Sequence, residues 1–502
     1  MEPSGSRSTG IVLLIIIMLI GAGIYYVKNG DVATSINKLT DGGTSTTEKK
    51  ADSSSQDTPQ PEETTSQPTP RMAVIGSNPV TVAQSVISVL KSTGSPNLAP
   101  DMDAYIQGIK AYDAGNFSEA LSSLSQINSG PRDMLAPVLM ENSRVLLEGN
   151  EYIEIAVAGP MTGDQALKGQ AELAGAALAQ QEINRNGGIS GKKIVIDIFD
   201  DRANKGNPTI NAAKSVVNSK ALAVIGHIGS SNTLAAAPIY EAGKIAAISP
   251  SSSSTKISNA GDYIFRVCSD DNAQGKALVD YAKQTGIKKA AIVYLPSDDY
   301  SRTLHDAIMQ EMRKVGINPG GEYIYEKEQM DFSETVSKIK ASKVDAVFFS
   351  GTQVEGSYFI IELKKEAPSV KVLGGDALYI KDLLQTAGNS ANGLITTTFF
   401  HAKAGFPFEA DFVKNFEETF KGTPNARSAL AYDAMYAIAN ALEESQNINR
   451  AGVEEGLKMV SFQGATGRIK FDNKGDVRGK PVVILRVENP NFVPVKAIYD
   501  NP

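Results

Sequence analysis

The sequence predicts an α/β fold of two doubly wound lobes with parallel sheets and a hinge, preceded by a small α-helical segment and a transmembrane helix. Strand-like and helix-like segments alternate from residue 151 onward, which indicates parallel sheets covered on both faces. The alternation continues for about 350 residues, and this length favours two sheets over one. Residues 10–27, GIVLLIIIMLIGAGIYYV, form an uncharged run of about the length that spans a bilayer.

The N-terminal run predicts a signal anchor over residues 1–28. Arg7 precedes the run, and two tyrosines and Lys28 close it, as is typical of an interfacial anchor. A weak signal-peptidase site at residues 21–23 leaves a cleaved signal peptide as the alternative. Both readings predict an extracytoplasmic protein, in the periplasm or at the cell surface, with the membrane as a partner of the N-terminal helix.

Two segments connect this anchor to the lobes. Residues 29–78 are rich in Ser, Thr, Pro, Gln and Glu, which predicts a disordered linker. Residues 79–150 show helical periodicity, with a break between two helices at Gly115-Asn116. The apolar positions of this helical pair are Tyr105, Ile109, Tyr112, Phe117, Leu121 and Leu124. The pair resembles one tetratricopeptide-like hairpin, so residues 79–150 are either a protein-partner surface or a helical spacer packed on its neighbour.

From residue 151 the elements follow in a regular order. Strands are predicted at 151–159, 191–201, 221–227, 245–250, 288–296, 344–351 and 371–376, and helices at 169–188, 208–220 and 304–316. We expect one bilobed ligand-binding domain over residues 151–502. Lobe 1 is expected to hold about 151–271 and 400–467, and lobe 2 about 272–399 and 468–502.

Composition excludes several classes of function. The net charge is −7, and Lys and Arg are scattered along the chain, whereas nucleic acid binding needs a concentrated basic surface. A single cysteine, Cys268, rules out a disulfide framework and a cysteine-rich zinc site. His227, His305 and His401 lie far apart and no GxSxG motif is present, so we expect neither an enzyme nor a cofactor or metal.

Serines follow two short apolar segments of lobe 1. Ser230 and Ser231 come after the strand that ends at His227, and Ser251–Ser254 follow Pro250. Helix capping explains the first pair but not four consecutive serines. Because ligands bind beyond the carboxyl ends of parallel strands, and helix N-termini favour anions, these hydroxyls predict a carboxylate-binding site.

The chain also resembles the leucine/isoleucine/valine-type substrate-binding proteins of ABC transporters, which have the type I periplasmic-binding-protein fold. The resemblance is carried by "IAVAGPMTGDQALKGQAELAGAALAQQEINRNGG", "VIGHIGSSNTLAAAPIYEAGKIAAISPSSSS", "YIFRVCSDDNAQG" and "GRIKFDNKGDV". It implies an amino acid or a related small polar metabolite captured by hinge closure and delivered to an ABC transporter permease.

The resemblance also implies ligand residues. Ser230 is expected to bind the ligand carboxylate together with Ser251 and Ser253. Tyr300 of lobe 2 is expected to close over the ligand, and Asp376 to accept its ammonium group. An acidic acceptor opposite hydroxyl donors is also what a zwitterion requires, while capping of the following helix is the alternative for Asp376.

Two positions depart from the family pattern. Lys168 stands in the first loop where the family commonly has an aromatic residue, and Thr352 stands where leucine-type binders have a tyrosine. Both changes polarise or enlarge the pocket for the ligand side chain, which puts branched-chain specificity in doubt. An envelope interaction or sensor protein on the same fold, such as a peptidoglycan-synthase activator, remains the alternative function.

Overall fold

The computed structural model describes residues 71–77, 79–92, 102–126, 134–163, 165–203, 206–405 and 410–499. The predicted signal anchor and the predicted linker up to residue 70 lie outside these residues. Within the described ranges, no helix is both long and apolar enough to cross a bilayer.

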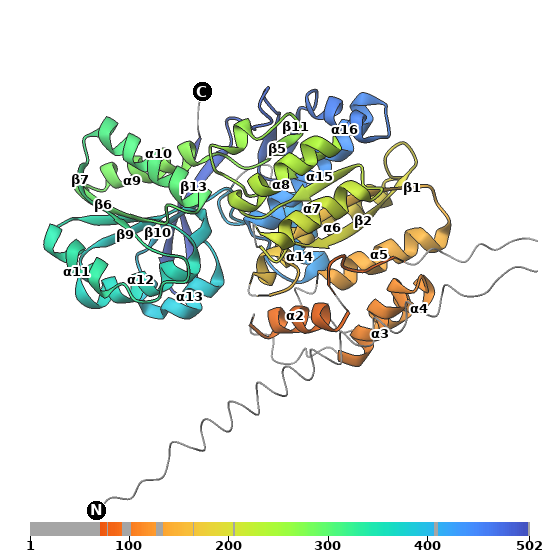
Figure 1. The fold of residues 1–502 in the computed structure, drawn as a ribbon, viewed down its shortest axis with the longest axis horizontal. Helices are drawn as coiled ribbons and strands as arrows, with labels where there is room; N and C mark the ends of the chain where they lie inside the picture. The colour runs from red at the N-terminus through yellow and green to blue at the C-terminus, as the bar shows by residue number, and fades with distance from the viewer. Residues whose placement is uncertain are drawn as a thin grey trace, which may run out of the picture. The chain divides into compact units, whose positions relative to one another are not determined.

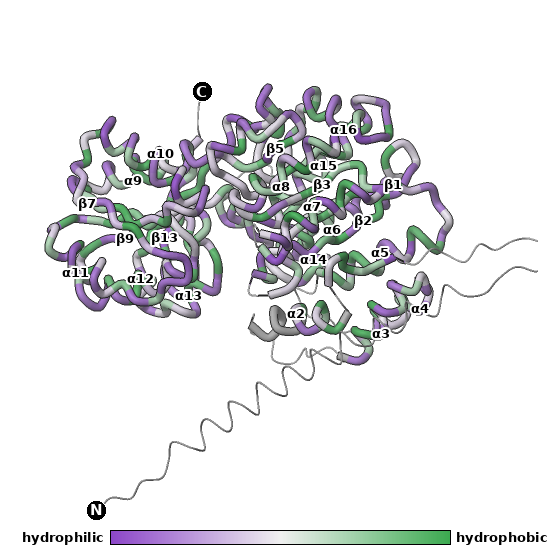
Figure 2. Tube along the Cα trace, in the orientation of Figure 1, coloured by the Kyte–Doolittle hydropathy of each residue, from purple (hydrophilic) through white to green (hydrophobic). Residues whose placement is uncertain are grey.

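The first sheet has five parallel strands in the order β2-β1-β3-β4-β5. They are β1 Tyr152–Gly159, β2 Lys193–Asp200, β3 Ala223–Gly226, β4 Ala246–Ser249 and β5 Ile264–Arg266. Their helices are α6 Ala166–Arg185, α7 Asn207–Asn218, α8 Ser230–Gly243, α14 Ala410–Phe420, α15 Ala426–Ser445 and α16 Arg450–Leu457. The strands are mostly apolar (Figure 2), and nearly all of their residues are buried, as expected for a parallel sheet covered by helices. We call this sheet with its helices lobe 1.

The second sheet has seven strands in the order β14-β13-β10-β9-β8-β6-β7. The parallel strands are β6 Lys289–Tyr294, β7 Asn318–Ile324, β8 Ala346–Ser350, β9 Lys371–Gly374 and β10 Ile395–Thr398. Helices α9 Asp271–Gln284 and α10 Asp299–Val315 cover one face. Helices α11 Ser333–Ser342, α12 Gln353–Glu366 and α13 Lys381–Ala387 cover the other (Figure 1). We call this unit lobe 2.

Lobe 2 is not wholly parallel, which corrects the predicted fold class. Strands β13 Pro481–Glu488 and β14 Asn491–Tyr499 form a hairpin that pairs antiparallel with β10. A turn with a cis Asn489–Pro490 bond connects them. Antiparallel strands at one edge of a parallel sheet are common, and here they return the chain from lobe 1 to lobe 2. A short hairpin, β11 Phe462–Gly464 and β12 Gly467–Ile469, precedes this return.

Among the described residues, four helices precede lobe 1: α2 Pro79–Ser92, α3 Met102–Asp113, α4 Phe117–Ser125 and α5 Leu135–Glu148. The break between α3 and α4 falls at Gly115-Asn116, as predicted from the sequence. Tyr105, Ile109, Tyr112, Phe117 and Leu124 are buried, whereas Leu121 is half-buried.

The segment before β1 covers the free edge of strand β2. Ile75 pairs with the strand, because its N–H donates to the Ile198 carbonyl at 2.8 Å and its carbonyl accepts from the Asp200 N–H at 3.0 Å. The Asn142 side chain of α5 bonds both the N–H and the carbonyl of Ile196, at 3.0 and 2.8 Å. A sheet edge without such partners exposes unpaired backbone groups.

Two features follow from this covered edge. The predicted linker boundary at residue 78 is wrong, because residues 71–77 pack against lobe 1 and Arg71 forms ion pairs with Glu154 and Asp197 at 2.9 and 2.5 Å. The contacts of α5 favour a helical spacer packed on its neighbour over a free-standing array.

We predict that Asn142→Ala lowers the free energy of unfolding by about 3 kcal/mol, because it leaves buried backbone groups of Ile196 without partners. Asn142 is fully buried and also accepts from Gln180 and donates to Tyr112. Urea unfolding of the full chain measures the change. Asn150→Ala is the control, because Asn150 bonds only the nearby surface residue Glu148 among the described contacts, and it should stay within about 0.5 kcal/mol. Equal stability of the two variants would contradict a structural role for the helical segment.

Candidate functional site

The two serine-bearing loops lie at the same end of the first sheet. Strands β3 and β4 pair in parallel, with Val224 opposite Ala247 and Ile225 opposite Ile248. The loops after them are therefore neighbours, and the Ser254 N–H donates to the Ser230 hydroxyl at 3.0 Å. Ser230, Ser253 and Ser254 are buried, and Ser251 is half-buried at the start of the second loop.

Ser230 does not cap helix α8. Gly229, with φ 88°, occupies the cap position, and Ser230 is the first helical residue. No side chain caps this helix end, so the capping explanation for Ser230 is wrong. Ser231 instead bridges the lobes, because its hydroxyl accepts from the Asp299 N–H and donates to the Asp298 carboxylate, both at 3.0 Å.

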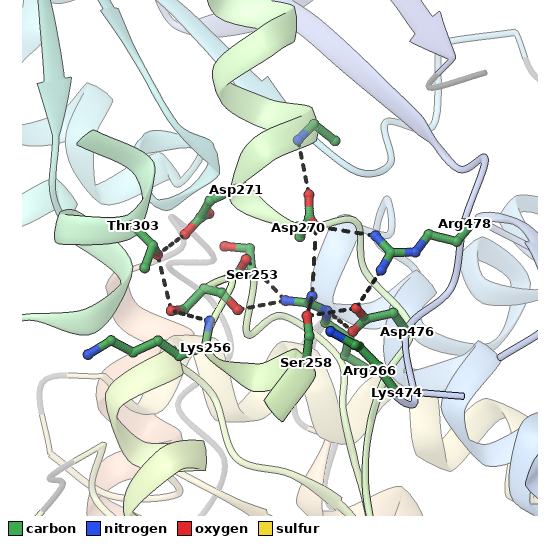
Figure 3. Close-up of polar contacts among 12 residues, drawn as sticks. Ser253, Lys256, Ser258, Arg266, Asp270, Asp271, Thr303, Lys474, Asp476 and Arg478 are labelled. Carbon is green, nitrogen blue, oxygen red and sulfur yellow. Dashed lines mark hydrogen bonds and ion pairs between the residues drawn. The ribbon is translucent and has the colours of Figure 1, made fainter. Parts of the chain in front are cut away.

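The buried side chain of Arg266 forms hydrogen bonds with the backbone of the second serine loop, Ser251–Ser254. Nη1 of Arg266, at the end of β5, donates to the carbonyl oxygens of Ser252–Ser254 at 3.4, 3.1 and 2.8 Å. Nη2 donates to the Ser258 hydroxyl at 2.7 Å. The carbonyl and the following N–H of a planar trans peptide point in opposite directions. With the carbonyls turned toward Arg266 (Figure 3), the N–H groups of the loop face the other way, and the N–H of Ser254 donates to the Ser230 hydroxyl.

The same arginine ties the loop to the segments that connect the lobes. Arg266 Nε lies 2.7 Å from Asp476 Oδ1, and both side chains are 1% exposed. Arg478 then contacts Asp476 and Asp270 at 3.0 and 3.3 Å (Figure 3). Lys480 Nζ donates to the Val267 carbonyl at 2.7 Å. The segment that leaves lobe 1 after β5 is thus cross-linked to the segment that returns before β13.

Lobe 2 contributes Tyr300 near the start of α10 and Asp376 directly after β9. The Tyr300 hydroxyl accepts from the Ala377 N–H at 3.4 Å, and Gln274 Oε1 accepts from the Asp376 N–H at 3.0 Å. Position 375 needs glycine, because a Cβ there would lie 2.2 Å from the Tyr300 hydroxyl. Asp376 does not cap α13, whose cap residue is Ile380, so this alternative for Asp376 is excluded.

Several buried polar atoms of this region have no hydrogen-bond partner among the described residues. They are Ser253 Oγ, Asp376 Oδ1, Arg427 Nε and both carboxylate oxygens of Glu172. Buried polar groups nearly always have a partner in folded proteins. The Ser253 hydroxyl of lobe 1 and one carboxylate oxygen of Asp376 in lobe 2, Oδ1, are left without a hydrogen bond among the described residues, although Ser253 interacts with Asp271, and Asp376 with Gln274 and Tyr300.

The charges of the site influence one another. Burial raises the pKa of Asp376, and the positive charge of Arg427 opposes this rise. Burial also raises the pKa of Tyr300 well above its ordinary value, with a further rise from the charge of Asp376. The pKa of Lys168 is lowered to about 7. Burial is the main cause, the charge of Arg427 acts in the same direction, and the charge of Asp382 opposes both. These groups of both lobes therefore share one poorly solvated environment.

A cavity of about 1050 Å³ is lined by both lobes. Lys168, Gln170 and Arg427 line it from lobe 1, and Tyr379, Asp382 and Phe492 line it from lobe 2. Lys168 Nζ donates to Gln353 Oε1 of α12 at 3.0 Å, which is a direct bond between the lobes.

Two sequence expectations about this region need correction or refinement. Lys168 lies in the first turn of α6 rather than in the preceding loop. Thr352 precedes α12, and its hydroxyl donates to Glu355 Oε2 at 2.7 Å. Thr352 is not part of the lining of the cavity, and neither are Ser230, Ser251, Ser253, Tyr300 and Asp376. The hydroxyl of Thr352 serves the start of α12.

Sequence reasoning missed Arg266, Arg427, Glu172 and Gln274. Arg266 ends the apolar segment YIFR, and a charged residue at the end of a buried strand is a usable signal. Arg427 and Glu172 lie inside ordinary helical patterns and carry no such signal. His227 belongs to the interior of lobe 1, because it is fully buried and bonds Asp201 and Tyr240 at 2.6 and 2.7 Å.

Comparison with known proteins gives consistent matches. A family model described as periplasmic binding protein matches residues 152–491. An amino acid binding protein of Pseudomonas aeruginosa is 30% identical over 342 residues, which cover 66% of this chain and 89% of that protein. A leucine binding protein from Thermotoga maritima is similar in structure, with a TM-score of 0.65, 28% identity, and coverage of 69% of this chain and 99% of its own. An ABC transporter substrate-binding protein from Desulfitobacterium hafniense, solved in complex with Leu, has a TM-score of 0.61 and 28% identity, with coverage of 69% and 100%.

We predict that Arg266→Met lowers the free energy of unfolding by about 3–5 kcal/mol, because it leaves Asp476 buried without its ion-pair partner. The double variant Arg266→Met with Asp476→Leu should regain much of this loss. Urea unfolding of both variants measures the coupling.

Arg486→Met serves as the control for this prediction. Arg486 forms an exposed ion pair with Glu488, so its loss should change stability by less than about 1 kcal/mol. A double variant that is less stable than Arg266→Met by the full cost of Asp476→Leu would show that the two charges do not interact.

Proposed function

Because the chain belongs to the periplasmic binding protein family, we propose that it is an extracytoplasmic solute-binding protein that captures an amino acid for uptake by an ABC transporter. The fold supports this reading, since residues 152–491 form the two lobes. The relatives named above bind amino acids or serve ABC transporters, according to their names.

One observation carries the proposal. Ser253 Oγ on lobe 1 and Asp376 Oδ1 on lobe 2 are buried without partners. A hydroxyl suits a carboxylate, and an ionised carboxylate suits an ammonium group. A zwitterion between the lobes would satisfy both atoms at once. An envelope scaffold would have no use for this combination.

The proposed roles follow from these positions. Ser230, Ser251 and Ser253, with the loop N–H groups that face away from Arg266, bind the ligand carboxylate. Asp376 accepts from the ammonium group, and the Tyr300 ring closes the site from lobe 2. The cavity beside Lys168 takes the ligand side chain.

Capture is coupled to closure of the lobes. A ligand that contacts both lobes binds the closed arrangement better, and this difference in affinity shifts the equilibrium. The contacts of Ser231 with Asp298 and Asp299, and of Thr303 with Ser254 at 3.1 Å, stabilise closure. The closed form is then the form that a transporter permease recognises.

The remaining parts of the chain position this receptor. Residues 1–28 act as a membrane anchor, and the linker that follows gives the folded part its reach. We place a protein partner on the exposed surface of helices α2–α5, which also pack against lobe 1.

We predict that Asp376→Asn weakens amino acid binding by about 2–5 kcal/mol, because the ammonium group loses its charged partner. A thermal-shift screen of the full chain against each proteinogenic L-amino acid identifies the ligand. Calorimetry then measures the affinity of the wild type and the variant.

Asp306→Asn is the matched control, since that carboxylate is 67% exposed on α10, and binding should be unchanged. Unchanged affinity in Asp376→Asn would remove Asp376 from the site. If no amino acid raises the melting temperature of the wild type, amino acid capture itself is wrong.

We further predict that Ser253→Ala lowers ligand affinity about fivefold to tenfold, which is the usual value of one hydrogen bond, and leaves the melting temperature of the ligand-free protein unchanged. The reason is that Ser253 Oγ bonds no described residue. Ser252→Ala should lower the melting temperature of the ligand-free protein and leave the ligand affinity unchanged, because Ser252 Oγ bonds Thr233 and the His227 carbonyl at 2.8 and 3.3 Å. A lower melting temperature in Ser253→Ala would assign this hydroxyl to the fold instead of the ligand.

A further inference from the structure

The cavity between the lobes contains two cationic side chains whose charges lack close partners. Lys168 of α6 and Arg427 of α15 both line it. Lys168 Nζ bonds the neutral Gln353 side chain at 3.0 Å, and Arg427 Nε is buried without a hydrogen-bond partner. Within the described ranges, no carboxylate lies within 4.0 Å of either cation.

The most deeply buried cations among the described residues, Arg266 and Lys480, are paired with carboxylates, and so is Arg71. Arg71, Arg266 and Lys480 lie 2.5, 2.7 and 3.7 Å from the carboxylates of Asp197, Asp476 and Asp433. Pairing is the general rule, because an unpaired charge in a poorly solvated place is costly. Lys168 and Arg427 depart from this rule together, and they do so in one cavity.

The position of Arg427 is fixed by its helix. Asn425 caps α15 by accepting from the Arg427 and Ser428 N–H groups at 2.9 and 3.2 Å. The Ser428 hydroxyl donates to the Ala171 carbonyl of α6 at 2.8 Å. The two helices are in close backbone contact here, since a Cβ at Gly175 would lie 1.8 Å from the Ser428 carbonyl oxygen. The guanidinium is therefore held beside the turn of α6 that carries Lys168.

The nearby acids do not balance this pair of cations. Burial raises the pKa of Glu172 well above its ordinary value, and the charge of Asp201 raises it further. Asp376 is assigned to the ligand ammonium group by the proposed function. Asp382 is half-buried. Its charge raises the pKa of Lys168, but by less than burial lowers it.

We propose that the ligand is an amino acid whose side chain ends in a carboxylate or a similar anionic group, and that Arg427 and Lys168 bind this group. The inference rests on the proposed function and adds the class of ligand to it. Arg427 supplies a planar fork of donors that matches a carboxylate, and Lys168 supplies from the same wall of the cavity an amino group whose protonated form an anionic group stabilises.

Calorimetry on the full chain tests this proposal with L-glutamate, L-aspartate, L-glutamine and L-leucine. In the wild type, we expect the better of the two acidic ligands to bind at least about tenfold more tightly than glutamine or leucine. Arg427→Gln should lower the affinity for that acidic ligand by about tenfold or more and change the affinity for glutamine by less than about threefold. Lys168→Gln should act in the same direction.

Two controls exclude an indirect effect. Arg427→Lys keeps the charge, so it should retain more affinity for the acidic ligand than Arg427→Gln. Arg185→Gln removes an exposed cation at the far end of α6 and should leave all affinities unchanged. Melting temperatures show whether each variant is folded, and Lys168→Gln provides the test if Arg427→Gln is not.

The outcomes separate this inference from the proposed function. If leucine or glutamine binds more tightly than both acidic ligands, the anionic class is wrong while amino acid capture stands. Equal losses for glutamate and glutamine in Arg427→Gln would place Arg427 on the shared head group and also overturn the inference. If none of the four ligands binds and the full screen finds no other amino acid, both proposals fail.

Discussion

The buried guanidinium of Arg266 is the interaction on which the binding region depends. The guanidinium donates hydrogen bonds to the carbonyl oxygens of Ser252–Ser254 and forms an ion pair with the carboxylate of Asp476. The first contact orients the serine loop, and the second joins that loop to the segment that returns to lobe 2. One side chain thus couples the geometry of the site to the geometry of the hinge. A buried ion pair alone is weak evidence of stability, but here it fixes which groups of the loop face the ligand.

In the proposed ligand cleft, the two lobes contribute polar groups of complementary chemistry, and some of these groups have no hydrogen-bond partner among the described residues. Lobe 1 supplies hydroxyls and N–H donors above Arg266, and lobe 2 supplies Asp376 and Tyr300. Arg427 and Lys168 add positive charge farther along the same interface. Each group alone would be an unfavourable burial, and together they define the charge pattern of a complementary ligand. In the proposed arrangement, specificity for the ligand side chain depends on α6 and α15, outside the serine loops.

Much of this fold could be predicted from the sequence, because parallel strands leave continuous apolar runs and the helices between them have a clear period. The neighbouring serine loops followed from the same pattern. Arg427 and Glu172 could not be predicted, since their chemistry appears only when α6 and α15 pack together and exclude water. The hairpin β13–β14 was missed because antiparallel edge strands interrupt the alternation. Residues 71–77 look like linker by composition, yet Ile75 and Arg71 find partners on β2 that the local sequence does not reveal.

The covered edge of β2 has a mechanical consequence. Because Ile75 is paired into the first sheet, residues 71–77 are fixed to lobe 1. Under the proposed hinge closure, lobe 2 therefore moves relative to the lobe through which the chain enters, and a partner that detects ligand capture would contact the outer surface of lobe 2.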